Sequence, residues 1–175
     1  MTNQKENTHF EEKEFLISFS DLTGYNKLAQ ALEDRETFAL LFAYYGIVSD
    51  EVKKAGGILL KFIGDAAMIA FPAEKADIGI NTLLTIKKKV DDFFEKKDLK
   101  HCKLMVKAHI GTVVSAEVDN RLDLFGKNVN IAATLKTNGF AITPQVFRKL
   151  STATRKYFKK HTPQVTYIPI EERHT

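Results

Sequence analysis

The chain has 175 residues, 44% of them hydrophobic, which is enough for one domain with a core of ordinary size. Its formal charge of +4 is only mildly basic, so we expect its lysine-rich stretches to be solvated helix faces and no nucleic acid to be bound. A single cysteine excludes an intrachain disulfide, and without a long apolar stretch or a signal-like N-terminus we expect a cytoplasmic protein with no membrane segment.

Residues 1–13 are polar and are expected to form a flexible tail before one domain over residues 14–170. Glu14–Ser20 predicts a buried strand, and Thr23–Leu32 predicts a helix with one apolar face. Apolar residues at helical spacing then predict a longer helix from about Glu36 to Lys54.

A hairpin is predicted next, because the strand-like runs Ile58–Ile63 and Ala66–Phe71 are separated only by Gly64-Asp65, a two-residue turn pair. The amphipathic pattern of Ala73–Lys97 predicts a helix. The later strands are predicted at Leu104–Gly111 and Thr112–Val118, either side of or continuous through Gly111, and at Leu122–Phe125, Phe140–Thr143 and Val165–Ile168. The later helices are predicted at Asn128–Lys136 and Pro144–Leu150, the last capped by Thr143.

The resulting order of the core is β-α-α-β-β-α-β, without strict alternation of strands and helices. Such an order predicts an α+β domain, with a mainly antiparallel sheet and helices packed on one face.

Two aspartates stand where strand-like runs break. Asp21 follows the run Phe15–Phe19, and Asp65 lies in the predicted hairpin turn. Carboxylates at the ends of neighbouring strands can share Mg²⁺ or Mn²⁺, and phosphates usually complete such a site. The alternative is that Asp21 caps the following helix and Asp65 is an ordinary turn residue.

Three blocks of sequence, taken together, are similar to motifs of one family. They are Phe19-Ser20-Asp21-Leu22-Thr23-Gly24-Tyr25, similar to F-x-D-I-x-G-F; Gly56-Gly57 with Lys61-Phe62-Ile63-Gly64-Asp65-Ala66-Ala67-Met68, similar to G-G and K-x-x-G-D-x-x-M; and Ala108-His109-Ile110-Gly111 with Asp123–Leu135, similar to G-I-H-x-G and D-x-x-G-x-x-V-N-x-A-x-R-L. From about Glu14 to Leu150 the chain thus resembles the catalytic domain of class III nucleotidyl cyclases, the adenylate/guanylate cyclase family.

This resemblance implies a ferredoxin-like, palm-type cyclase fold with a βααββαβ core and an enzyme, a phosphorus–oxygen lyase, that converts ATP to 3′,5′-cyclic AMP and pyrophosphate. It also implies a homodimer with shared active sites, in which one protomer supplies the metal ligands and the other the purine pocket. Asp21, Asp65 and the carbonyl of Leu22 would hold two Mg²⁺ or Mn²⁺ ions per site.

The other expected site residues also follow from the resemblance. Backbone N–H groups of Thr23, Gly24 and Tyr25 would hold the triphosphate at a helix start, and Asn130 would orient the ribose during catalysis. Lys61 and Asp123 would read the base, and a lysine donor with a carboxylate acceptor complements adenine rather than guanine. His109 is expected to be a packed structural residue.

The chain departs from the family pattern at Thr134, where the family has an arginine that stabilises charge on the phosphate. Losing such a group typically costs about 10²–10³ in rate. Cations that could substitute, from sequence alone, are Lys127, Lys136 and Arg121, and a later triphosphate-binding lysine would be Lys159 or Lys160.

A catalytically degenerate cyclase-homology domain, which binds nucleotide or only dimerises, therefore remains the alternative function. A polymerase-palm-like nucleotidyl transferase has less support, because no template-binding region is evident. The segment between Gly111 and Asp123, whose counterpart in the family helps to pair protomers, is compact here.

Overall fold

The computed structural model describes residues 10–162 and 165–171. Its strands are β1 (Phe10–Leu22), β2 (Ile58–Ile63), β3 (Ala66–Pro72), β4 (Leu104–Val118), β5 (Arg121–Phe125), β6 (Phe140–Ile142), β7 (Phe158–His161) and β8 (Thr166–Pro169). Its helices are α1 (Tyr25–Ala31), α2 (Asp34–Lys54), α3 (Ala76–Glu95), α4 (Lys127–Thr134), α5 (Pro144–Lys149) and α6 (Thr152–Arg155), with one 3₁₀ turn, η1 (Ala73–Lys75).

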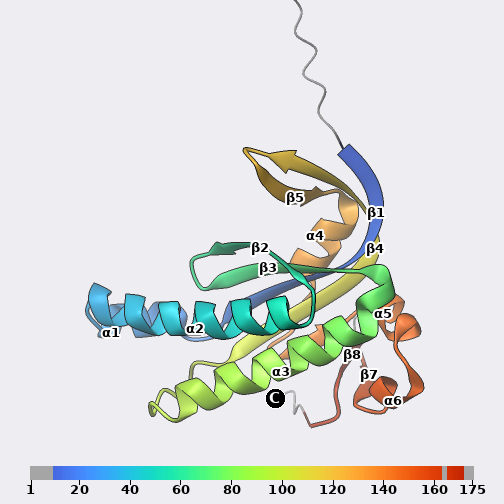
Figure 1. Cartoon of the computed structure of the whole chain (residues 1–175). Coiled ribbons are helices and arrows are strands. Elements are labelled where there is room, and N and C mark those ends of the chain that lie inside the picture. Colours follow the sequence, from blue (N-terminus) through green and yellow to red (C-terminus); the bar gives the residue numbers. More distant parts are fainter. Residues whose placement is uncertain (1–9, 163–164, 172–175) are drawn as a thin grey trace, which may run out of the picture.

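The strands form one mixed sheet in the order β2-β3-β1-β4-β6-β8-β7, and β5 folds back onto β4 (Figure 1). Every strand pair is antiparallel except β4 with β6. The predicted α+β class, the βααββαβ order and the mainly antiparallel sheet are therefore confirmed.

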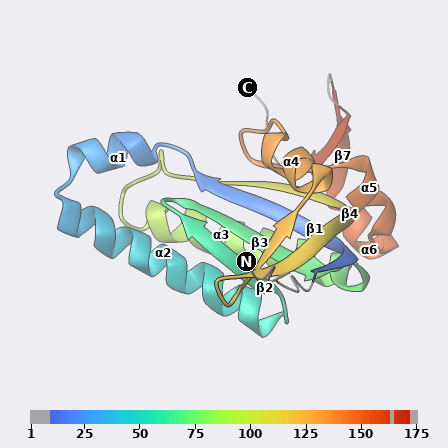
Figure 2. The same ribbon diagram turned by 90° about the horizontal axis from the view of Figure 1, so that it is seen from above.

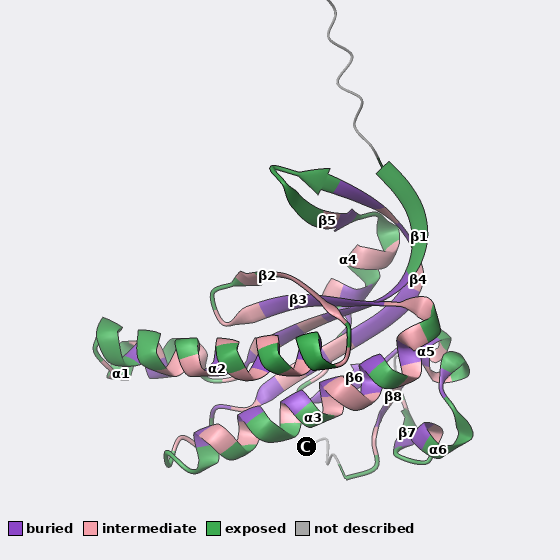
Figure 3. Ribbon diagram, viewed as in Figure 1, coloured by how far each residue is buried: buried purple, intermediate pink, exposed green. Residues whose placement is uncertain are grey.

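The two faces of the sheet are covered unequally. Helices α2 and α3 lie along one face and bury the larger core against it, as the inward purple stripes in Figure 3 show. This core contains Tyr44 and Val48 from α2 and Leu83 and Phe94 from α3. The opposite face carries a smaller cluster, to which α4 contributes Ala132, and much of that face has no helix over it. The sheet thus has a helix-covered face and a more open face, which we call the α4 face.

Strands β4 and β5 continue beyond the sheet as an arm that stands clear of α2 and α3 (Figure 1). A two-residue turn joins them, and both turn residues, Asp119 and Asn120, have positive φ, which matches the right-handed twist of the hairpin. The arm and the strand start beside it expose large apolar side chains, namely Phe10, Val118, Leu122 and Phe125.

Two segments differ from the sequence predictions. Strand β1 begins at Phe10 because its first residues pair with Val113–Ala116 of β4, so residues 10–13 extend the strand instead of belonging to a tail. Residues 1–9 of that predicted tail lie outside the described residues. Helix α6 and strand β7 were not predicted. Strand β7 forms an edge of the sheet, and both elements lie at the opposite end of the molecule from α1 (Figure 2).

Thr143 stands at the predicted N-cap of α5, yet its side chain makes no capping hydrogen bond. Its hydroxyl contacts Nδ1 of the buried His109 at 2.9 Å, and Nε2 of the same ring contacts Asn128 at 3.0 Å. His109 therefore joins β4 to the starts of α4 and α5, which agrees with its predicted structural role. Within the described residues no helix combines the length and the apolar character needed to span a bilayer.

Candidate functional site

The two predicted metal-binding aspartates are brought together by strand pairing. Ser20 of β1 lies opposite Ala67 of β3, so Asp21 lies beside the hairpin turn that holds Asp65. The turn has positive φ only at Gly64, as expected for a glycine-first two-residue turn. The N–H of Leu22 donates to Oδ2 of Asp65 at 3.3 Å, which ties the strand end to the turn.

The alternative role of Asp21 as a helix cap does not match the structure. Helix α1 has Gly24 as its N-cap and no side-chain capping hydrogen bond. Burial, and after it the neighbouring carboxylate of Asp21, raises the pKa of Asp65 to about 6. Two close carboxylates that disfavour each other's charge are a donor set that fits a divalent cation, because the cation relieves the repulsion.

In the described part of the chain no group of three or more His, Cys, Asp or Glu side chains is placed to hold a metal. Any ion held by Asp21 and Asp65 would therefore take its remaining ligands from backbone carbonyls, water or a phosphate. This sparse protein donor set is typical of Mg²⁺ sites that are completed by a substrate.

The turn after Leu22 is shaped for close backbone contacts. Gly24 has a φ of +72°, and a Cβ there would lie 2.9 Å from Cδ2 of His101, so the turn and the close approach both require glycine. The N–H of Thr23 donates to the carbonyl of Lys103 at 2.8 Å. Of the three N–H groups predicted to hold a triphosphate, those of Gly24 and Tyr25 are thus the ones at the start of α1 without an intrahelical partner.

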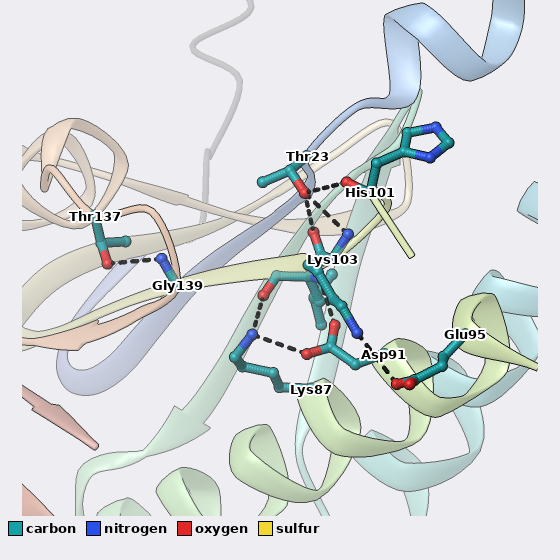
Figure 4. A network of polar contacts seen from close by, with 9 residues as sticks. Thr23, Lys87, Asp91, Glu95, His101, Lys103, Thr137 and Gly139 are labelled. Carbon is teal, nitrogen blue, oxygen red and sulfur yellow. Dashed lines mark hydrogen bonds and ion pairs between the residues drawn. The ribbon is translucent and has the colours of Figure 1, made fainter. Parts of the chain in front are cut away.

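A polar network that the sequence did not indicate holds this turn against the start of β4 (Figure 4). The hydroxyl of Thr23 contacts the carbonyls of His101 and Lys103 and accepts the N–H of Lys103 at 2.9 Å. One residue further along, Asp91 of α3 accepts the N–H of Leu104 at 2.8 Å, and Lys87 bridges Asp91 and the Leu104 carbonyl. The turn at Thr23 and Gly24, which follows Asp21, is therefore braced from α3.

The predicted base-reading residues meet within one protomer. Nζ of Lys61, on β2, lies 2.6 Å from Oδ2 of Asp123, on β5, while Oδ1 of Asp123 accepts the N–H of Leu124 at 2.9 Å. The lysine side chain is 41% exposed and the aspartate side chain 24%. Both line an open cavity of about 480 Å³ between β2 and the arm.

Both aspartates of the strand ends and the lysine–aspartate pair belong to the same side of the sheet. Ser20 contacts Tyr44 of α2, so its neighbour Asp21 points to the opposite, α4 face. Phe62 stacks on Tyr45 of α2 with ring centroids 3.9 Å apart, so Lys61 also points to the α4 face.

Helix α4 carries Asn130 and Thr134 on its exposed side. The hydroxyl of Thr134 donates to the carbonyl of Asn130 at 2.8 Å, so it is used within the helix. Lys107 of β4 was not predicted as a site residue, and its Nζ lies 3.3 Å from the carbonyl of Ala133 at the end of α4.

The two late lysines of β7 point to different faces. Phe158 packs into the core under α2 and α3, so Lys160 shares its side and Lys159 points to the α4 face. Nζ of Lys159 donates to the carbonyl of Ile170 at 3.2 Å. Of the two predicted candidates for triphosphate binding, Lys159 is the one on the same face as the other site residues.

Comparison with known proteins gives a family match over most of the chain. The model of the adenylate and guanylate cyclase catalytic domain matches residues 9–168. An adenylate cyclase of Anabaena cylindrica is 29% identical over 152 residues, which cover 77% of this chain and 30% of that protein. The chain therefore spans less than a third of the length of this curated relative.

Solved structures share the fold. A bacterial light-regulated adenylyl cyclase superposes with a TM-score of 0.83 at 23% identity, over 96% of this chain and 55% of that one. The monomeric guanylyl cyclase domain of the RhoGC fusion protein from the aquatic fungus Blastocladiella emersonii has a TM-score of 0.76 at 18% identity, over 93% and 98% of the two chains. At such low identity these two likenesses establish the fold alone.

Proposed function

This chain belongs to the family of adenylate and guanylate cyclase catalytic domains, and from that membership we propose that it converts ATP to 3′,5′-cyclic AMP and pyrophosphate. The observation that carries the proposal is that Asp21 with Asp65, and Lys61 with Asp123, lie on the same face of the sheet as two charged pairs of different chemistry. The first pair suits metal ions and phosphates, and the second suits a purine edge.

Asp21 and Asp65, with the carbonyl of Leu22, would hold two Mg²⁺ or Mn²⁺ ions. Bound there, the ions would supply Lewis-acid chemistry, since they acidify the ribose 3′-hydroxyl and neutralise charge on the triphosphate. The chain itself contributes the placement of the nucleotide. Amides of Gly24 and Tyr25 hold phosphate oxygens, and the exposed Asn130 orients the ribose for in-line attack on the α-phosphorus.

Lys61 and Asp123 make ATP the better substrate. The lysine donates to N1 of adenine and the aspartate accepts from the 6-amino group, whereas guanine places a donor and an acceptor in the reverse order. A guanine in this pocket would leave buried polar groups unpaired, and this is the strongest basis of discrimination between similar ligands.

The two pairs would act together across a homodimer, with the metal ions held by one protomer and the base by the other. The intact Lys61–Asp123 contact supports this division, because both base-reading residues come from one protomer. The exposed apolar side chains of the arm, including Phe125 and Leu122, supply the surface that a partner protomer would cover.

The test is a cyclase assay with ATP and GTP, each with Mg²⁺ and with Mn²⁺, at several protein concentrations. We expect cyclic AMP to be the main product and activity per protomer to rise with concentration, because the site is shared. The proposal fails if no cyclic AMP forms with Mn²⁺ and ATP and an Asp65→Ala variant is indistinguishable from the unmodified chain.

A second candidate, a nucleotide-binding regulatory module without turnover, is favoured by Thr134 alone. Its hydroxyl is committed to the Asn130 carbonyl and cannot supply positive charge to a phosphate. Calorimetric binding of ATP without product formation would identify this module.

A further inference from the structure

The proposed reaction needs a cation near the end of helix α4. Thr134 occupies that position and is neutral, so the helix itself does not supply the cation. Two of the cations suggested by sequence lie elsewhere in the fold. Lys127 begins the eight-residue helix, about 10 Å along its axis from Thr134, and Arg121 lies in the arm. Lys136 is exposed beyond the helix end.

Lys107 of β4 approaches the end of α4 from the side of the sheet. Nζ of Lys107 lies 3.3 Å from the carbonyl of Ala133, the residue that precedes Thr134. Val106 and Ala108, its neighbours on β4, pack into the core under α2 and α3, so the side chain of Lys107 points to the α4 face.

Strand register also places Lys107 beside the metal-site strand end. Lys107 lies opposite Phe19 of β1, and Asp21 lies opposite Met105, so Lys107 and Asp21 are diagonal neighbours on one face. Within one protomer the lysine is thus near both the end of α4 and the carboxylates that bind cations.

The ammonium group of Lys107 has hydrogen-bonding capacity left over. It carries three donors, and the Ala133 carbonyl takes one of them. Among residues 10–162 and 165–171 no carboxylate forms an ion pair with it, in contrast to Lys61 with Asp123 and Lys87 with Asp91. The C-terminal end of a helix favours a nearby cation, so the last turn of α4 holds the Lys107 ammonium group in place. Its remaining donors can then serve an anion beside the helix.

We infer that Lys107 is the catalytic cation of this chain, in the role that an arginine at position 134 would otherwise take. This inference rests on the proposed cyclase function. In the reaction a bond forms between the ribose 3′-oxygen and the α-phosphorus, the bond from that phosphorus to the bridging oxygen breaks, and pyrophosphate leaves with the electron pair. The 3′-hydroxyl proton passes to solvent, while Lys107 stays protonated and donates to a non-bridging oxygen whose charge grows in the transition state.

The test compares Lys107→Gln with the control Lys88→Gln, which removes an exposed charge from α3, on the other face of the sheet. For Lys107→Gln we expect kcat to fall about 100-fold, within the range for one lost charge-stabilising donor. We expect KM for Mn²⁺-ATP to rise only about fivefold, since ground-state ion pairing contributes less. Lys88→Gln should keep both constants, and Lys107→Arg should keep most of kcat because the charge remains.

A second arm places an arginine on the helix. Thr134→Arg should raise kcat strongly in the Lys107→Gln background and only slightly in the unmodified chain, because the two cations serve one role and their effects are not additive. Equal gains in both backgrounds would overturn the inference. If Lys107 only straps α4 to β4, Lys107→Gln will lower the unfolding temperature and leave kcat per folded protomer unchanged, which also overturns it.

Failure of the proposed function gives a different result. If the unmodified chain makes no cyclic nucleotide, the cyclase proposal fails, and calorimetry with Mn²⁺-ATP then judges the lysine. A roughly fivefold weaker affinity for Lys107→Gln than for Lys88→Gln retains Lys107 as a phosphate-facing cation. Equal affinities, or no binding by any variant, overturn that assignment.

Discussion

The two charged pairs on the α4 face are built in opposite ways. Asp21 and Asp65 are two carboxylates held together by strand pairing, and burial, followed by the proximity of Asp21, raises the pKa of Asp65 to about 6. Lys61 and Asp123 are opposite charges that neutralise each other at 2.6 Å. Under the proposed function, a bound cation would relieve the first pair, and a purine would replace the contact within the second. The two pairs therefore illustrate two ways in which a site can favour a ligand. Carboxylates held close together favour a cation, and an internal ion pair offers a donor and an acceptor that a ligand can take over.

The largest expected effect on activity comes from replacing one aspartate of the Asp21–Asp65 pair. Asp65→Asn should abolish cyclase activity, by about 10³-fold or more, because a metal ligand and its charge are lost together. Activity is measured with Mn²⁺ and ATP, with Asp98→Asn, at an exposed position just beyond the end of α3, as the control. Retention of more than a tenth of the activity would show that the two pairs do not divide the chemistry in this way.

A change in the Lys61–Asp123 pair should alter the preference for ATP over GTP. Lys61→Met leaves the partly buried Asp123 carboxylate unpaired and removes a donor to adenine, so kcat/KM for ATP should fall about 10- to 100-fold. Lys160→Met, which points to the other face, is the matched control. The comparison fails if ATP and GTP lose kcat/KM equally, since the pair would then not read the base.

A smaller effect of opposite sign is expected on stability without metal. The pKa of Asp65 is raised above its unfolded value of 3.8, so the native state holds the proton more tightly between about pH 4 and 6. The stabilisation from that proton is present at low pH and is lost as pH rises through 6. Asp65→Asn should thus be more stable than the unmodified chain at pH 7, by about 1 kcal/mol after allowance for solvent screening, and little different at pH 4.

Thermal unfolding in a chelator across that pH range measures this difference. The same series tests metal affinity, which should fall as pH drops below 6 because the carboxylate must lose its proton to bind. A stability gap that is constant with pH would show that repulsion is not what distinguishes the aspartate pair.

The smallest effect serves as an internal reference on the same pH axis. Burial lowers the pKa of His109, which makes hydrogen bonds from both ring nitrogens. The unfolded chain takes up this proton first, so stability from neutral His109 is present above about pH 6.5 and is lost as pH falls, opposite in sign to Asp65. His109→Gln should flatten that slope in thermal unfolding near pH 6, and an unchanged slope would contradict it.

Local patterns accounted for much of this architecture. The hairpin at Gly64-Asp65 was predictable because a glycine-first turn between apolar runs has few alternatives. The pairing of β3 with β1 then places Asp65 beside the end of β1. The pairing of Lys61 with Asp123 followed from family motifs, since 62 residues separate them and no local rule joins them.

Contacts that depend on register and on helix placement were not predictable. Lys107 acquires its position from the pairing of β1 with β4 and from the end of α4, and no motif marks it. The hydroxyl of Thr23 likewise joins residues about 80 positions apart, because it bonds to backbone carbonyls, which any residue type provides. Strand β7 was missed because its lysines hide the apolar alternation that a half-buried strand usually shows.

The continuous pairing of β1 with β4 fixes the distance between the two ends of this strand pair within the protomer. The pairing begins at the arm, where Phe10 lies opposite Ala116. It ends next to Asp21, where Leu22 lies opposite Leu104, and no bulge interrupts it. These ends are about 40 Å apart along the strand. A one-residue insertion in β1 would turn every later side chain to the other face, Asp21 included. The spacing between whatever the arm contacts and the carboxylates is therefore set by the count of residues in one strand.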